Sequence, residues 1–142
     1  MLAVDTNILV YSEIVSSAHH RAARRLLTEL VEGPVAWAIP WPCVYEFLRV
    51  VTHPRVFSPP APLDLALHDL DQILASPTLV LLSETERHAE VMNSVVSESG
   101  VTGNLLHDAH IAALCIEHGV AELLTGDRDF SRFPLRVKNP FR

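Results

Sequence analysis

The sequence has little cysteine and glycine, and it has no long apolar run. Its two cysteines, Cys43 and Cys115, form no C-x-x-C pair, so it offers neither a disulfide framework nor a cysteine-based zinc site. Its five glycines form no glycine-rich phosphate loop. No apolar stretch approaches the roughly 18 residues of a membrane-spanning helix, and the start lacks the charged region of a signal peptide. We therefore expect a cytoplasmic protein with reduced thiols and no membrane segment.

Positive charge is also scarce. Lysine and arginine number 11 against 17 acidic residues, and the resulting net charge of −6 argues by itself against a nucleic-acid-binding protein. The basic residues are nevertheless grouped. Three lie at Arg21, Arg24 and Arg25, and the segment 128–142 carries Arg128, Arg132, Arg136, Lys138 and Arg142 against Asp129 alone. These groups are either ordinary solvated surfaces or basic rims around an acidic pocket.

The length of 142 residues suits a single domain, 1–142, that can bury a core without a metal or a disulfide. Hydrophobic residues make up 49% of the sequence, and the mean hydropathy is +0.22. This apolar surplus hints at a partner surface or a dimer surface.

Short apolar runs alternate with longer segments of helical periodicity. Strands are predicted at 2–4, 35–39, 79–82 and 122–125, with a short fifth at 135–137. Helices are predicted at 17–32, 42–51, 63–74, 83–99 with Ser83 as its cap, and 105–118 closed by Gly119. This order predicts an α/β fold in three layers, α/β/α, with a mostly parallel central sheet. Such sheets bind ligands beyond the carboxyl ends of their strands.

Two acidic residues follow predicted strands at that edge. Asp5 ends the first strand, where it suits either a functional crevice or the N-cap of a helix that begins at Thr6. Thr6 and Asn7 could orient its carboxylate. Asp127 follows the fourth strand, and we expect the nearby Asp129 to cap the short turn after it.

Two further acidic residues lie on helices. Glu46 interrupts an apolar run, where its carboxylate needs a cation or hydrogen bonds, although Arg49 one turn later could simply pair with it. Asp108 falls on the same helical stripe as Ile111, Ala112 and Cys115, which places it inward near the positive end of the helix. The alternative is that Asp108 only caps that helix.

Together, Asp5, Glu46, Asp108 and Asp127 bring carboxylates from two strand ends and two helices to one edge of the sheet. Oxygen ligands favour Mg²⁺ or Mn²⁺ over Zn²⁺. A cation held there would activate water against a phosphodiester. His107 and His110 flank Asp108 but fall off its stripe, so we expect both at the surface rather than as ligands.

Four segments in this order resemble the PIN domain, and within it the VapC toxins of bacterial VapBC toxin–antitoxin systems. They are Val4-Asp5-Thr6-Asn7, the lone Glu46 in its helix, Asp108-Ala109-His110-Ile111-Ala112-Ala113, and Thr125-Gly126-Asp127-Arg128-Asp129-Phe130. The turn Val51-Thr52-His53-Pro54-Arg55, after Trp41-Pro42-Cys43, is similar to that of one VapC subgroup. The resemblance covers essentially the whole chain.

The resemblance implies a PIN fold and an Mg²⁺- or Mn²⁺-dependent endoribonuclease that cuts RNA, often tRNA or ribosomal RNA. Asp5, Glu46, Asp108 and Asp127 match its four acidic positions, with Asp129 as the alternative fourth acid, and Thr125 matches a polar residue of the pocket. Family members usually form homodimers and are silenced by a VapB antitoxin. Two alternatives remain. One is a PIN-like module without activity. The other is a metal-dependent phosphatase, although this sequence lacks the Asp-x-Asp pair that would supply its nucleophile after the first strand.

Overall fold

The computed structural model describes all 142 residues, and its centre is a parallel sheet of five strands. The strands follow the order β3-β2-β1-β4-β5, and every neighbouring pair is parallel. Their bounds are β1 Leu2–Val4, β2 Trp37–Pro40, β3 Leu79–Leu82, β4 Glu122–Leu124 and β5 Val137–Lys138. The predicted parallel α/β sheet is confirmed. The carboxyl ends of the central strands β1 and β4 point to the same edge.

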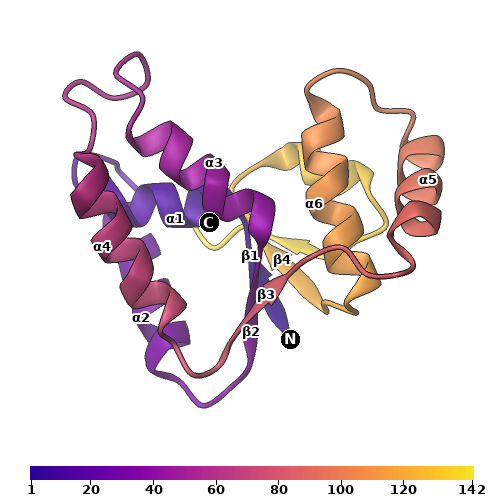
Figure 1. The fold of residues 1–142 in the computed structure, drawn as a ribbon, viewed down its shortest axis with the longest axis horizontal. Helices are drawn as coiled ribbons and strands as arrows, with labels where there is room; N and C mark the ends of the chain where they lie inside the picture. Colours follow the sequence, from indigo (N-terminus) through magenta and orange to yellow (C-terminus); the bar gives the residue numbers. More distant parts are fainter.

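Six α-helices flank the sheet. They are α1 Thr6–Glu13, α2 His20–Glu32, α3 Trp41–Val51, α4 Leu63–Leu74, α5 His88–Ser99 and α6 Leu105–Glu117, and a 3₁₀ turn follows at Arg128–Arg132. Figure 1 shows α1 to α4 gathered on one side, with α5 and α6 packed together on the other. None of the helices is both long and apolar enough to span a membrane.

The core explains why the central strands are short and apolar. Ala3, Val4, Ala38 and Ile39 are completely buried because helices cover both faces of the sheet. Trp37 is also fully buried, and its indole N–H donates a 3.3 Å hydrogen bond to the Ser76 hydroxyl. A hydrophobic cluster of 30 buried residues joins the two helical layers through the sheet. This core fixes the strand ends that carry the acidic residues.

Two predicted helix starts were wrong, and α1 was not among the predicted helices. The helix predicted at 17–32 begins only at His20, and α1 was foreseen only through the capping role of Asp5. The helix predicted from Ser83 begins at His88. Its expected first turn is instead a loop held by α6, because the Thr85 N–H donates a 2.8 Å hydrogen bond to Glu117. Tertiary contacts therefore override the capping pattern there.

Candidate active site

All four predicted acidic residues line one pocket of about 250 Å³ at the carboxyl edge of the sheet. Asp5 reaches it from the end of β1 and Asp127 from the turn after β4. Glu46 comes from the middle of α3, and Asp108 from the first turn of α6. The structure therefore brings together side chains that lie far apart in the sequence, as the sequence predicts.

Asp5 is the most enclosed of these side chains, with 4% of the residue exposed. Its Oδ1 accepts a 2.7 Å hydrogen bond from the Thr6 N–H and faces the Cys43 thiol at 3.7 Å. Burial raises the pKa of Asp5 from 3.8 to about 6 despite its hydrogen bonds, and the nearby Glu46 and Asp127 add to the rise. Asp5 is also the N-cap of α1, so the functional and structural readings are compatible.

A network of polar groups fixes the second oxygen of Asp5. Its Oδ2 accepts hydrogen bonds from the Thr125 hydroxyl at 2.8 Å and from the Asn7 amide at 3.0 Å. The Asn7 amide also bonds the Thr125 hydroxyl, and its carbonyl accepts from the Gly126 N–H, both at 3.0 Å. The network ties β1 to the turn that carries Asp127. Asn7 therefore orients the Asp5 carboxylate, as the sequence suggested, whereas Thr6 contacts this carboxylate through its backbone N–H.

Asp108, Asp127 and Asp129 form a second group of carboxylates. One oxygen from each lies within 4.8 Å of the others. Burial raises the pKa of Asp108 from 3.8 to about 6, followed by repulsion from Asp127 and Asp5. Asp129 was expected to cap the following turn, but this was wrong. The cap is Asp127, whose Oδ1 accepts a 2.8 Å hydrogen bond from the Asp129 N–H, while Asp129 pairs with Arg132 at 3.2 Å.

Glu46 has a partner that sequence reasoning missed. Its Oε2 lies 2.6 Å from Nε2 of His107 and accepts a 3.2 Å hydrogen bond from the Thr6 hydroxyl. Arg49 pairs with its other oxygen at 3.6 Å, as the helical spacing allowed. The hydrogen bond from His107 lowers the pKa of Glu46, and Glu46 in turn raises that of His107. The sequence carried no signal for this pair, because 61 positions separate the two residues.

Two larger hollows adjoin the acidic pocket. One, of about 780 Å³, shares Glu46 and Asp108 with the pocket and also includes Tyr45, Arg49 and His107. The other, of about 310 Å³, shares Asp127 and is lined by Arg128 and Arg142 among others. The acidic pocket thus shares residues with two hollows that contain basic side chains. The first basic group, Arg21, Arg24 and Arg25, instead lines a separate hollow of about 370 Å³ on α2.

The donor set fits a hard divalent cation. The pocket offers carboxylate oxygens, and the pKa values of Asp5 and Asp108 are raised, first because burial disfavours their charged forms and then because neighbouring carboxylates repel them. A bound cation would relieve that repulsion and keep these groups ionised. Mg²⁺ and Mn²⁺ prefer such oxygen ligands. Asp5, Glu46, Asp108 and Asp127 line this pocket and could hold such an ion, and Asp129 lies within reach of Asp108 and Asp127.

Comparison with known proteins identifies the family. The PIN domain matches residues 2–135. Ribonuclease VapC37 of Mycobacterium tuberculosis is 35% identical over 133 residues, which cover 94% of this chain and 92% of the relative. The crystal structure of VapBC2 from Rickettsia felis, bound to a DNA fragment from their promoter, superposes with a TM-score of 0.69 at 22% identity and covers 97% of both chains.

A second solved structure has the same fold. It is that of Mycobacterium tuberculosis VapC20, described as a sarcin–ricin loop cleaving toxin, with a TM-score of 0.66 at 17% identity, covering 92% of this chain and 93% of the other. The fold, the acidic pocket and the full-length sequence match lead to one conclusion. The chain belongs to the VapC ribonucleases of the PIN domain family.

Proposed function

We propose that this protein is an Mg²⁺-dependent endoribonuclease, with Mn²⁺ as an alternative ion, that acts as the toxin of a VapBC system. The observation that carries the proposal is the single pocket lined by Asp5, Glu46, Asp108 and Asp127. Its substrate is an RNA phosphodiester, because the chain belongs to the VapC ribonucleases and the pocket offers carboxylates that suit a divalent cation. The PIN-domain match over residues 2–135 supports the same chemistry.

The chain's own residues have distinct parts in this proposal. Asp5 is held rigidly by Thr6, Asn7 and Thr125, so its Oδ2 keeps one orientation. Asp108 and Asp127 face it from α6 and from the turn after β4. Bound among these oxygens, Mg²⁺ would polarise a phosphodiester oxygen, acidify the attacking water and stabilise the leaving oxygen.

Glu46 and His107 lie at the rim of the acidic pocket, on the side of the larger hollow. Their 2.6 Å contact places an acid–base pair where the acidic pocket opens into the larger hollow. Glu46 can accept a hydrogen bond from water entering the pocket, and His107 fixes the position of its carboxylate. We therefore assign Glu46 to orienting water and His107 to positioning Glu46.

The substrate class is structured cellular RNA such as tRNA or ribosomal RNA. The hollows on either side of the acids would take the chain on both sides of the scissile bond, and their arginines suit its phosphates. Tyr45, 70% exposed at the edge of the larger hollow, suits stacking on an unpaired base. VapC20, which has the same fold, is described as a sarcin–ricin loop cleaving toxin.

The protein partners are a VapB-type antitoxin and a second copy of the chain. The similar VapBC2 structure is a toxin–antitoxin pair bound to promoter DNA. Large apolar side chains stand exposed on this chain, among them Leu63, Leu65 and Leu67 of α4. Such side chains are compatible with a covered surface. Light scattering of the purified chain, alone and coexpressed with its antitoxin, tests both partners.

Cleavage of total RNA by the purified protein tests the activity. We expect discrete fragments in Mg²⁺ or Mn²⁺ that disappear with EDTA and with Asp5→Asn or Asp108→Asn. The matched control is His68→Ala, which changes an exposed side chain on α4. Folded Asp5→Asn protein that cuts at the wild-type rate would overturn the assignment. Metal binding without cleavage by antitoxin-free protein, across tRNA and ribosomal RNA, would favour an inactive PIN-like module instead.

A further inference from the structure

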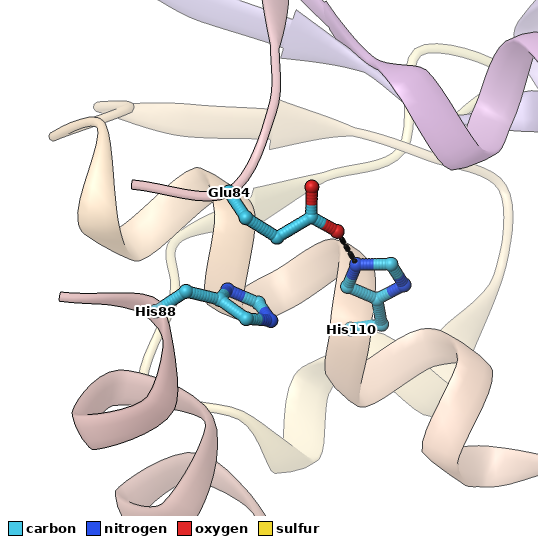
Figure 2. Close-up of side chains that lie close together, drawn as sticks. All are labelled: Glu84, His88 and His110. Carbon is cyan, nitrogen blue, oxygen red and sulfur yellow. Dashed lines mark hydrogen bonds and ion pairs between the residues drawn. The ribbon is translucent and has the colours of Figure 1, made fainter. Parts of the chain in front are cut away.

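A second cluster of possible metal ligands lies outside the acidic pocket. Glu84 follows β3, His88 begins α5, and His110 lies on α6 one turn and a half from its start. One ligand atom of each lies within 4.8 Å of the others. Figure 2 shows the three side chains converging from these separate elements. None of them lines the pocket that holds Asp5 and Asp108.

A buried carboxylate orients one of the two imidazoles. Oε2 of Glu117 lies 2.7 Å from Nδ1 of His88, and its Oε1 accepts a 2.8 Å hydrogen bond from the Thr85 N–H. The Glu117 side chain is fully buried, whereas 21% of the His88 side chain is exposed. A carboxylate on Nδ1 fixes the imidazole tautomer that offers Nε2 as a ligand, and metal-binding histidines commonly have such a partner.

The other two groups already meet. Nε2 of His110 lies 2.8 Å from Oε1 of Glu84, and the rings of His88 and His110 have centroids 5.5 Å apart. The Glu84 side chain is 52% exposed and the His110 side chain 35% exposed, so an ion can reach both from solvent. Small rotations of these side chains would turn their ligand atoms toward a common centre.

The ligand chemistry differs from that of the acidic pocket. Two imidazole nitrogens and one carboxylate oxygen suit Zn²⁺, which prefers nitrogen and sulfur ligands in a four-coordinate site. Mg²⁺ takes oxygen ligands and competes poorly for imidazole. The acidic pocket and this cluster therefore select different ions.

We propose that Glu84, His88 and His110 form a second metal site that binds Zn²⁺ or a similar transition-metal ion. Glu117 positions His88 and does not touch the ion. The bound ion links the segment after β3 and the start of α5 to α6, the helix that also carries Asp108. The site stabilises the packing of these elements and is independent of the nuclease reaction.

Titration of the full-length protein with Zn²⁺ in excess Mg²⁺ tests the site, because the excess Mg²⁺ competes with Zn²⁺ for carboxylate oxygens but not for imidazole nitrogens. We expect one equivalent of Zn²⁺ to bind, to raise the melting temperature, and to shift the imidazole NMR signals of His88 and His110. His110→Ala and Glu84→Gln should abolish this Zn²⁺-induced rise. Glu117→Gln should weaken binding by about 10–100-fold, the usual effect of losing a group that orients a ligand.

His68→Ala is the matched control, because His68 lies on α4 away from the cluster. His110 and Glu84 are the key positions because both are partly exposed, so their variants should fold, as circular dichroism without metal will verify. Wild-type protein that takes up no Zn²⁺ in excess Mg²⁺ would overturn the proposal. So would equal Zn²⁺ affinity in wild type and in folded His110→Ala. Neither result bears on RNA cleavage, so the two proposals fail separately.

Discussion

The Thr125 hydroxyl donates a 2.8 Å hydrogen bond to Oδ2 of Asp5 across 120 positions of sequence. Both residues are buried, with 1% of Thr125 and 4% of Asp5 exposed. The same hydroxyl accepts from the Asn7 amide and from the Asp127 N–H, each at 3.0 Å. One side chain thus sets the position of an acid on β1 and of the turn carrying an acid after β4. Thr125 is a positioning residue for both.

Thr125→Val should separate this role from simple packing. Valine keeps the shape but removes the hydroxyl, so Asp5 and the Asp127 N–H each lose a hydrogen bond. We expect Mg²⁺ affinity or RNA cleavage to fall by about 10–100-fold, while the free energy of unfolding falls by about 1–3 kcal/mol. Mg²⁺ titration and cleavage rates measure the effect.

Thr125→Ser is the control for this prediction. Serine retains the hydroxyl and should keep most of the activity. Full activity in Thr125→Val together with a loss in Thr125→Ser would mean that the threonine methyl group, and not the hydrogen bond to Asp5, matters at this position.

The sequence was sufficient to predict the acidic pocket because the relevant rules are local. Asp5 and Asp127 follow apolar strands, and parallel strands end at one edge. Asp108 could be placed inward because helical periodicity aligns it with Ile111 and Cys115, both buried in the structure. The role of Glu46 was the hardest of the four to predict, because its position on the helix also allowed a simple ion pair with Arg49.

Contacts between distant segments could not be predicted in the same way. His107 was expected to be an ordinary surface histidine, yet it binds Glu46. Ser83 looked like a helix cap, but Glu117 of α6 holds the Thr85 N–H and delays the helix to His88. Capping patterns compare only neighbouring residues, so they miss a competing partner that arrives with the tertiary fold.

The Glu46–His107 pair predicts a measurable histidine titration. Because Glu46 raises the pKa of His107, its imidazole should stay protonated to higher pH than in the Glu46→Gln variant. The pair stabilises the fold in the pH range where Glu46 is ionised and His107 is protonated; this contribution is lost as pH rises through the raised pKa of His107 and as pH falls through the lowered pKa of Glu46. NMR titration of metal-free protein measures both midpoints.

His68→Ala, which changes an exposed side chain on α4, is the control variant and should leave the His107 midpoint unchanged. An equal His107 midpoint in wild type and Glu46→Gln would show that the 2.6 Å contact does not persist in solution.

Glu13 predicts a pH dependence of stability away from the active site. Burial raises its pKa from 4.5 to about 7, with Asp69 adding to the rise across a shared hollow. A raised folded-state pKa favours the protonated fold, so this stabilisation is complete below pH 4.5 and is lost as pH rises through about 7. Glu13→Gln should therefore raise the melting temperature at pH 8 and leave it nearly unchanged at pH 4.5.

The size of this gain is limited because Glu13 is only partly buried. Solvent screening reduces it to on the order of 1 kcal/mol, or roughly 4 °C in melting temperature. Thermal unfolding at both pH values measures it, with Glu90→Gln on the exposed face of α5 as the control. A gain of equal size at both pH values would contradict the titration argument.

The basic side chains beside the acidic pocket predict which surface binds RNA. Arg128 and Arg142 line the hollow that shares Asp127 with the pocket, whereas Arg21 and Arg25 line a separate one. In an Asp5→Asn background, which prevents cleavage, replacing Arg128 and Arg142 by alanine should weaken RNA binding. Each lost phosphate contact should also flatten the slope of log affinity against log salt by roughly 0.7.

The pair Arg21→Ala and Arg25→Ala removes the same charge from α2, so it is the matched control for net charge. If binding depended only on overall charge, both pairs would weaken it equally, because the protein carries a net charge of −6 and either pair makes it more negative. A larger effect at Arg128 and Arg142, measured by fluorescence anisotropy across a salt series, would localise the RNA path to the acidic edge. A larger effect at Arg21 and Arg25 would move that path to α2 and separate it from the four acids.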